Sequence, residues 1–247
     1  MALRWMLATL ALLCASGVEA ADLRVLTAGA YKPVLTAMQP AFEAASGDHL
    51  LISNDTAGAI AKRVDAGEAV DVVVSSQEGI AQLVASGRLV AASARALATV
   101  GIGVAVKAGA PEPNIATLAD FRAALLAAPS IAYLDPAAGG SSGIYLTALF
   151  EKMGIAAEIR PKAVLVNGGL VAERLLDGRA ALAVHQMSEL KAVPGVVIVG
   201  PIPAEVQNTT IYAGAITPGA PASASALLAT LRTAAAVLAD KGMQPPP

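Results

Sequence analysis

Short apolar runs alternate with longer segments of helical periodicity along the chain after residue 20. Residues 23–27, 50–53 and 70–74 are apolar runs of strand length, and each is followed by a small polar loop and a segment with apolar residues at helical spacing. Three strand–loop–helix units in a row predict a parallel sheet with helices on both faces.

A second series of the same kind begins after a polar joint near residues 93–97. Its expected strands are residues 99–106, 131–134, 163–166, 180–184, 196–199 and 209–216, and a long helix at 224–239 ends the pattern. The chain is therefore expected to form two α/β lobes that are joined by two crossings. Residues 21–96 with 212–247 form the first predicted lobe, and residues 97–211 form the second.

The first 20 residues have the pattern of a secretory signal. Arg4 precedes an apolar run that is too short to span a membrane comfortably, and small residues precede Ala21. We expect cleavage after Ala20 and a periplasmic protein, with an uncleaved N-terminal anchor as the alternative. Cys14, the only cysteine, lies within this segment, so the mature chain would form no disulfide.

Composition and motifs exclude several classes of function. The net charge is −2 without a basic stripe, which argues against nucleic-acid binding, and 3% aromatic residues provide few stacking groups for a sugar. The two histidines, His49 and His185, are far apart and no mature cysteine accompanies them, so no zinc motif is present. We expect no metal, no cofactor and a monomeric protein.

The most informative stretch is residues 130–155. Asp135-Pro136 ends a short strand, a loop of small residues follows, and a helix is expected to begin near Gly143. Glycines in the loop allow close approach of a bound group, and the adjacent pair Ser141 and Ser142 can cap the helix or donate hydroxyls outward. The unpaired N–H groups of a helix start suit an anion, although a plain strand-to-helix turn is the alternative.

Similar small polar loops follow the other strands. In open parallel sheets, ligands bind beyond the carboxyl ends of the strands, so two sets of such loops facing each other predict a binding cleft. The loops are residues 29–32, 54–58, 75–77, 139–142, 167–169 and 185–186.

Several of these loops carry recognisable motifs. They are Ala28-Gly29-Ala30, Thr56-Ala57-Gly58 before a helix that ends at Gly67, Asp71-Val72-Val73-Val74-Ser75, and Asp135-Pro136 followed by Ser142-Gly143-Ile144-Tyr145. With these motifs the mature chain resembles, over nearly its whole length, the type II periplasmic solute-binding proteins of ABC importers, and most closely their molybdate-binding branch. The resemblance implies a two-lobed α/β fold with parallel-rich sheets, flanking helices and a hinge between the lobes.

The resemblance also implies ligand contacts. The family's first-loop serine aligns with Ala30, its second-loop serine with Thr56 or Ala57, and its late tyrosine with Gln186, whereas two backbone donors align with Ser142 and Gly168. Because three side-chain donors differ, a small organic carboxylate is favoured over an oxyanion such as molybdate. The candidate ligand-binding residues are Ala30, Tyr31, Thr56, Ala57, Ser75, Ser141, Ser142, Gly168 and Gln186.

Two functions remain open. The first is a carrier that closes around a small anionic solute and delivers it to the membrane subunits of an ABC importer. The alternative is an enzyme on the same scaffold, since the chain also resembles periplasmic aconitate isomerases, which bind a tricarboxylate and move a proton. The enzyme would need a base, for which His185, Asp55 and Tyr31 are the candidates. The alternative for His185 is a structural role, and the alternative for Asp55 is to cap the following helix.

Overall fold

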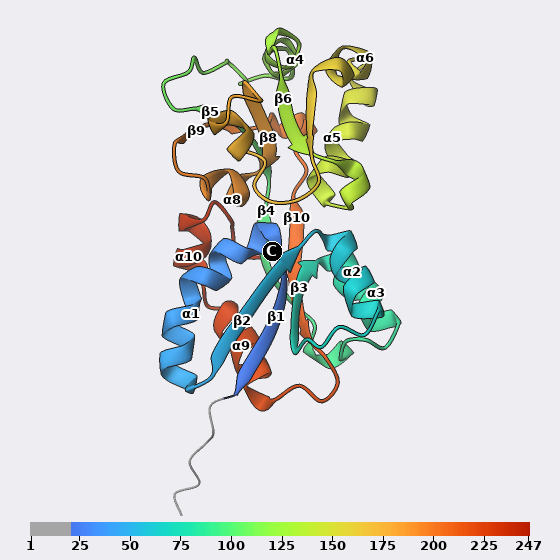
Figure 1. Cartoon of the computed structure of the whole chain (residues 1–247), viewed down its shortest axis with the longest axis vertical. Coiled ribbons are helices and arrows are strands. Elements are labelled where there is room, and N and C mark those ends of the chain that lie inside the picture. The colour runs from blue at the N-terminus through green and yellow to red at the C-terminus, as the bar shows by residue number, and fades with distance from the viewer. Residues whose placement is uncertain (1–20) are drawn as a thin grey trace, which may run out of the picture.

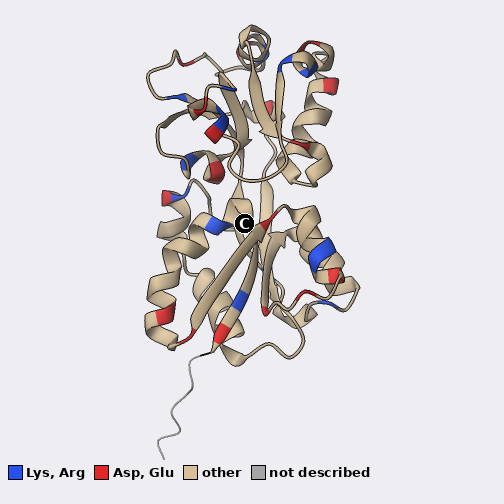
Figure 2. Cartoon of the chain, viewed as in Figure 1, with Lys and Arg blue, Asp and Glu red and all other residues tan. Residues whose placement is uncertain are grey.

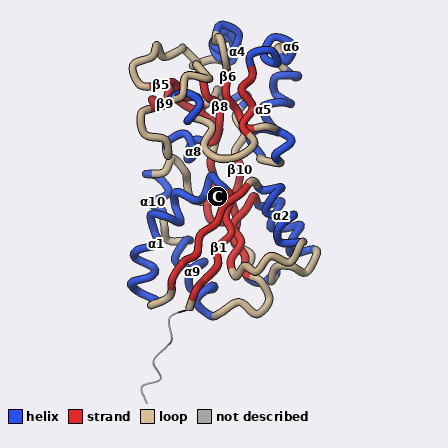
Figure 3. Tube along the Cα trace, in the orientation of Figure 1, coloured by secondary structure: helices blue, strands red, loops and turns tan. Residues whose placement is uncertain are grey.

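The computed structural model describes residues 21–247, and the predicted signal peptide lies outside the described residues. These residues form two lobes that lie end to end along the longest axis of the molecule (Figure 1). Each lobe contains a five-stranded sheet with helices around it (Figure 3), which confirms the predicted two-lobed α/β fold. Within residues 21–247, no helix has the length and apolar character needed to cross a membrane.

Lobe 1, residues 22–100 and 210–244, has the strand order β2-β1-β3-β10-β4. Strand β1 is parallel to β2 and β3, and β10 is antiparallel to β3 and β4. The strands are β1 (Asp22–Ala28), β2 (His49–Asp55), β3 (Val72–Ser76), β4 (Arg95–Val100) and β10 (Thr210–Ile216). The helices are η1 (Gly29–Tyr31), α1 (Lys32–Ser46), α2 (Ala57–Asp65), α3 (Gln77–Ala85), η2 (Ala91–Ser93), α9 (Ala222–Leu231) and α10 (Ala235–Asp240).

The terminal helix differs from the prediction. A single helix was expected over residues 224–239, but α9 and α10 are separate. The chain turns between them because Thr233 donates both its N–H and its hydroxyl to the carbonyl of Thr230, at 3.1 and 2.8 Å. These local bonds replace the helical bonds of the last turn.

Lobe 2, residues 102–206, has the strand order β7-β6-β8-β5-β9. Strand β6 is parallel to β7 and β8, whereas β5 is antiparallel to β8 and β9. The strands are β5 (Ile102–Lys107), β6 (Ile131–Leu134), β7 (Ala163–Val166), β8 (Leu182–Gln186) and β9 (Val196–Pro201). The helices are α4 (Leu118–Ala127), η3 (Pro136–Ala138), α5 (Ser141–Lys152), α6 (Ala156–Ile159), η4 (Arg160–Lys162), α7 (Glu173–Leu176), α8 (Met187–Lys191) and η5 (Ala204–Val206).

The crossings between the lobes lie a few residues from their predicted positions. The apolar run at 99–106 is two strands, because β4 pairs with β10 in lobe 1 and β5 pairs with β8 in lobe 2. Gly101 separates them, so lobe 1 extends beyond the expected boundary at residue 96, and it resumes at Thr210. Gln207 in the second crossing accepts the N–H of Ile102 at 2.7 Å and donates to its carbonyl at 2.9 Å. These two bonds tie one crossing to the other.

Each lobe has its own hydrophobic core. In lobe 1, residues from the sheet pack with the inner faces of α1, α2, α3 and α9. In lobe 2, two separate clusters form, one of which includes Phe121 and Phe150 and the other Leu134 and Leu190. Both lobes are thus packed independently, which leaves the strand-end loops between them available for a site.

Candidate functional site

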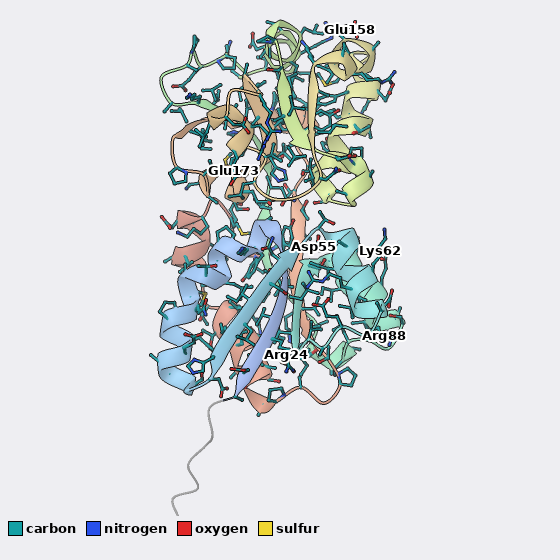
Figure 4. All side chains as sticks on the ribbon, viewed as in Figure 1. Arg24, Asp55, Lys62, Arg88, Glu158 and Glu173 are labelled. Atoms are coloured by element: carbon teal, nitrogen blue, oxygen red, sulfur yellow. The ribbon has the colours of Figure 1, made fainter. Side chains whose placement is uncertain are left out.

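A cavity of about 860 Å³ lies between the two lobes. Its walls come from the loops beyond the carboxyl ends of β1 and β2 in lobe 1 and of β6, β7 and β8 in lobe 2. Figure 4 shows Asp55 at the edge of lobe 1 and Glu173 on lobe 2, and both side chains line the cavity. The cavity occupies the place where the sequence predicts that the strand-end loops meet.

Most of the predicted site residues line this cavity, including two of the three candidate bases. They are Ala30, Asp55, Thr56, Ala57, Ser141, Ser142, Gly168, His185 and Gln186. The structure therefore brings together residues from loops that are as far apart in sequence as Ala30 and Gln186. Their contact with a ligand stays a prediction.

Tyr31 and Ser75 do not line the cavity, contrary to expectation. The ring of Tyr31 turns into the core of lobe 1, where its centroid lies 6.5 Å from that of Tyr212. Burial raises the pKa of Tyr31, so this phenol is unsuited to act as a base. Ser75 is fully buried because β10 pairs alongside β3, with Ala213 opposite Ser75.

Asp55 lines the cavity, but both of its carboxylate oxygens contact other groups of the protein. Its Oδ2 lies 3.3 Å from Arg63 Nη1, and its Oδ1 accepts the N–H of Thr56 at 2.9 Å. The N-cap of α2 is Thr56, whose hydroxyl accepts the N–H of Ala59 at 3.2 Å, so the predicted capping role of Asp55 belongs to its neighbour. Its contacts with Arg63 and Thr56 make Asp55 a poor candidate base.

The N-terminus of α5 points its free N–H groups toward the cavity. The helix begins at Ser141, two residues earlier than expected, after the N-cap residue Gly140. A Cβ atom on Gly143 would lie 2.2 Å from the carbonyl oxygen of Leu134, so only glycine lets the helix start this close to β6. This helix start is therefore suited to an anion, whereas at the start of α2 on lobe 1 the N–H groups of Gly58 and Ala59 already bond Gly139 and Thr56.

Behind this helix start lies a cluster of three polar side chains. Ser142 Oγ is 2.8 Å from His185 Nδ1, and His185 Nε2 is 3.0 Å from Glu189 Oε2. Ser142 and His185 are almost fully buried, and Glu189 is 9% exposed and lines the cavity. Although Glu189 Oε2 is this close, His185 Nε2 makes no hydrogen bond to any of the described residues.

Both ring nitrogens of His185 therefore lie next to protein groups. The second carboxylate oxygen of Glu189 points away from His185. Its Oε1 faces the first loop of lobe 1, where a Cβ atom on Gly29 would lie only 2.6 Å away. Glu189 thus reaches across the cavity from lobe 2 to lobe 1. Of the three groups, it is the one placed to meet a ligand.

Sequence reasoning missed Glu189. The predicted role of the Ser142 backbone N–H stays a prediction, and the side chain of Ser142 contacts His185. The available signal was the spacing of His185 and Glu189, four residues apart across the end of a strand. That spacing brings the two side chains together because α8 starts at Met187, immediately after β8.

Gln186 belongs to a second network, which connects the lobes at the base of the cavity. Its Oε1 accepts the hydroxyl hydrogen of Tyr212 at 2.7 Å. Its Nε2 donates to Ser141 Oγ at 2.9 Å and to Thr210 Oγ1 at 3.3 Å. Tyr212 and Thr210 come from β10 of lobe 1, whereas Gln186 and Ser141 come from lobe 2.

The lobes also touch at one rim of the cavity. The N–H of Gly58 donates to the carbonyl of Gly139 at 3.1 Å, and the Thr56 hydroxyl donates to the carbonyl of Ala138. A Cβ atom on Gly58 would lie 3.1 Å from Gly139 Cα, so the contact depends on the absence of a side chain. Both lobes are therefore in contact around the cavity, as in a closed form.

Charged groups around the cavity are of mixed sign. Lys32, Lys191 and Lys241 line it on the cationic side, and Lys32 donates to the neutral Asn54 Oδ1 at 2.8 Å. Figure 2 shows that acidic and basic residues are interspersed over both lobes. Within residues 21–247, no three His, Cys, Asp or Glu side chains are placed to hold a metal ion.

Comparison with known proteins gives one match in sequence and several in structure. The chain is 37% identical over 252 residues to an aconitate isomerase from Pseudomonas sp., and the match covers 98% of this chain and 94% of the relative. The structure is similar to the periplasmic molybdate-binding protein of Azotobacter vinelandii, with a TM-score of 0.76 and 18% identity over 91% of this chain and 100% of that one. It is also similar to a sulfate-binding protein from Mycobacterium tuberculosis, with a TM-score of 0.70 and 17% identity over 91% of this chain and 87% of that one.

The structural relatives share the fold at low identity and therefore carry no residue roles to this chain. The model of one protein family, described as bacterial extracellular solute-binding protein, matches residues 23–244, which is nearly the whole described chain. The chain belongs to this family of bacterial extracellular solute-binding proteins.

Proposed function

We propose that the protein is a periplasmic isomerase that binds aconitate or a closely related carboxylate in the cleft and moves a proton on it. The observation that carries this proposal is Glu189, a largely buried carboxylate that lines the same cavity as the N-terminus of α5. A carboxylate next to an anion costs binding energy by repulsion, and a carrier gains nothing from it. A general base must stand at that position if a proton is to be removed from the bound ligand.

The similarity to the aconitate isomerase supports a tricarboxylate as the class of substrate. Aconitate has a methylene carbon between a double bond and a carboxylate, so removal of one of its protons leaves a delocalised carbanion. Return of the proton to the former vinyl carbon moves the double bond by one position without any other change in composition. This chemistry needs a base, a place for the negative charge and no cofactor.

The residues of the cleft match these needs. Glu189 Oε1 would take the proton and return it, while the contact between Glu189 Oε2 and His185 holds the carboxylate in place. Ser142 fixes the other ring nitrogen of His185 at 2.8 Å. The free N–H groups at the start of α5 would stabilise the substrate carboxylates and the charge that develops on them.

A carrier for an ABC importer is the second candidate. The family match and the rim contact between Gly58 and Gly139, which closes the cleft, favour it. The two candidates differ in the fate of the ligand, because a carrier binds the ligand and releases it unchanged.

Turnover therefore separates them. The mature chain, purified from the periplasm, is incubated with trans-aconitate in D₂O, and proton NMR follows the appearance of cis-aconitate and the uptake of deuterium. We expect turnover by the parent, and a loss of about 10²–10⁴-fold in kcat for Glu189→Gln, which keeps the size of the side chain but is no base. Tight binding of trans-aconitate without any cis product would refute the isomerase and leave the carrier.

A further inference from the structure

We propose that Ser141, and not Gln186, donates a side-chain hydrogen bond to the ligand, and that Gln186 and Tyr212 hold Ser141 in the donor orientation. This inference rests on the proposed binding of a carboxylate in the cleft.

The hydrogen bonds of the Gln186 amide are fully used within the protein. One hydrogen on Nε2 is donated to Ser141 Oγ at 2.9 Å, and the other to Thr210 Oγ1 at 3.3 Å. The amide oxygen accepts from Tyr212 at 2.7 Å. Although Gln186 lines the cavity, its side chain is 2% exposed with both of its N–H groups occupied, so it has no donor left for a ligand.

Ser141, in contrast to Gln186, has a hydrogen that it can donate to a ligand. It accepts a hydrogen bond from Gln186, which leaves its own O–H hydrogen to be donated. The residue lines the cavity as the first residue of α5, and the cap of that helix is Gly140, so its hydroxyl has no capping role. A ligand carboxylate at the helix start would receive the Ser141 hydroxyl together with the backbone N–H groups.

Within the protein, the alternative acceptor for the Ser141 hydrogen is Thr210 Oγ1, which lies 3.5 Å from Ser141 Oγ. A charged carboxylate is a stronger acceptor than a neutral hydroxyl oxygen. Binding of the ligand is therefore expected to turn the Ser141 hydrogen from Thr210 to the ligand.

Tyr212 determines which end of the Gln186 amide faces Ser141. Its single hydroxyl hydrogen goes to Gln186 Oε1, which keeps Nε2 on the side of Ser141. Without that hydroxyl the amide is free to turn over. Its oxygen would then accept the hydrogen of Ser141, and the ligand would lose the donor even though Ser141 itself is unchanged.

The test is a double-mutant cycle on binding of tricarballylate, the saturated tricarboxylate that has no double bond to move. Calorimetric titration of the mature chain is expected to show that Ser141→Ala and Tyr212→Phe each weaken binding by about ten- to a hundredfold. The double variant is expected to bind about as tightly as either single variant, because both changes remove the same hydrogen bond. Tyr145→Phe is the matched control, since Tyr145 donates its hydroxyl to the Val206 carbonyl at 2.8 Å, outside this network.

Two results would overturn the proposed roles of Ser141 and Tyr212. One is unchanged affinity in Ser141→Ala. The other is a double variant whose fold-loss of affinity equals the product of the fold-losses of the two single variants. Melting temperatures of all variants show whether a loss of affinity comes from loss of folding, which a merely structural role of Tyr212 would produce.

Failure of the proposed function gives a different result. A parent that binds tricarballylate without turning over trans-aconitate is no isomerase, yet the cycle on tricarballylate still decides the role of Ser141. A parent that binds neither compound contradicts both proposals.

Discussion

Replacing Gly29 with alanine should separate substrate binding from turnover. Gly29 lies in the first loop of lobe 1, and a Cβ atom there would lie 2.6 Å from Glu189 Oε1, which is closer than such atoms approach in real proteins. Gly29 has no positive φ, so alanine fits its backbone without strain. The added methyl group therefore acts on the tip of one side chain, that of the proposed base.

The size of the effect follows from the distance. Glu189 Oε1 must retreat by about 0.4–0.8 Å to restore ordinary contact. A displacement of about 1 Å in a catalytic group costs up to about a hundredfold in rate. We therefore expect kcat to fall about ten- to a hundredfold, while the affinity for tricarballylate stays close to that of the parent, because the backbone donors remain.

Initial rates of trans- to cis-aconitate conversion give kcat, and calorimetry gives the affinity. Gly168→Ala is the control variant, because Gly168 lines the same cavity and an added Cβ atom there meets no atom within 4 Å. We expect kcat to fall far less in Gly168→Ala than in Gly29→Ala. A second comparison uses Glu189→Asp, whose shorter side chain no longer reaches Gly29. In that background, Gly29→Ala should cost little further activity.

Two results would contradict this prediction. One is full turnover by Gly29→Ala, which would mean that the position of Glu189 does not matter. The other is an equal loss in the parent and in the Glu189→Asp background, which would mean that alanine acts on the loop itself.

Three further predictions concern stability. Gln207→Ala should lower the free energy of unfolding by about 1–3 kcal/mol, measured by urea denaturation, because the buried N–H of Ile102 loses its acceptor. Gly143→Ala should prevent stable folding, seen as loss of a cooperative thermal transition, since its Cβ would collide with backbone that cannot yield. The N–H of Ala21 holds the pKa of Asp48 below its usual value, so Asp48 stabilises the fold above the ordinary carboxyl pKa and this contribution is lost in acid. The melting temperature of Asp48→Asn should therefore lie below that of the parent near neutral pH and converge with it below about pH 3.

The sequence was sufficient to predict the alternating elements, the two lobes and a cleft at the strand ends. These features depend on local periodicity and on the rule that parallel strands present their loops at one edge. The interlobe network at Tyr212 was not predictable in the same way, because β10 enters lobe 1 antiparallel between β3 and β4 after a crossing from lobe 2. No repeating unit in the sequence specifies that insertion.

The wrong predictions have a common cause. Tyr31 follows β1 and Ser75 lies near the end of β3, so both were expected to face the cleft, but a position at a strand end does not fix the direction of the side chain. The turn of η1 directs Tyr31 into the core, and the pairing of β10 covers Ser75. Glu189 was missed for the converse reason, since it lies in a helix, and the orientation of α8 directs its side chain into the cavity.

If the proposed function holds, the position of Glu189 would explain how a solute-binding fold supports catalysis. Glu189 belongs to lobe 2 and its Oε1 lies against the Gly29 loop of lobe 1, so this contact exists only when the lobes are together. In a carrier, closure traps the solute and signals to a partner. Under the proposed function, the same closure would bring a base from one lobe against a ligand held between both. The proton transfer would therefore be confined to the closed form, and a carboxylate at position 189 would distinguish this use of the hinge from transport.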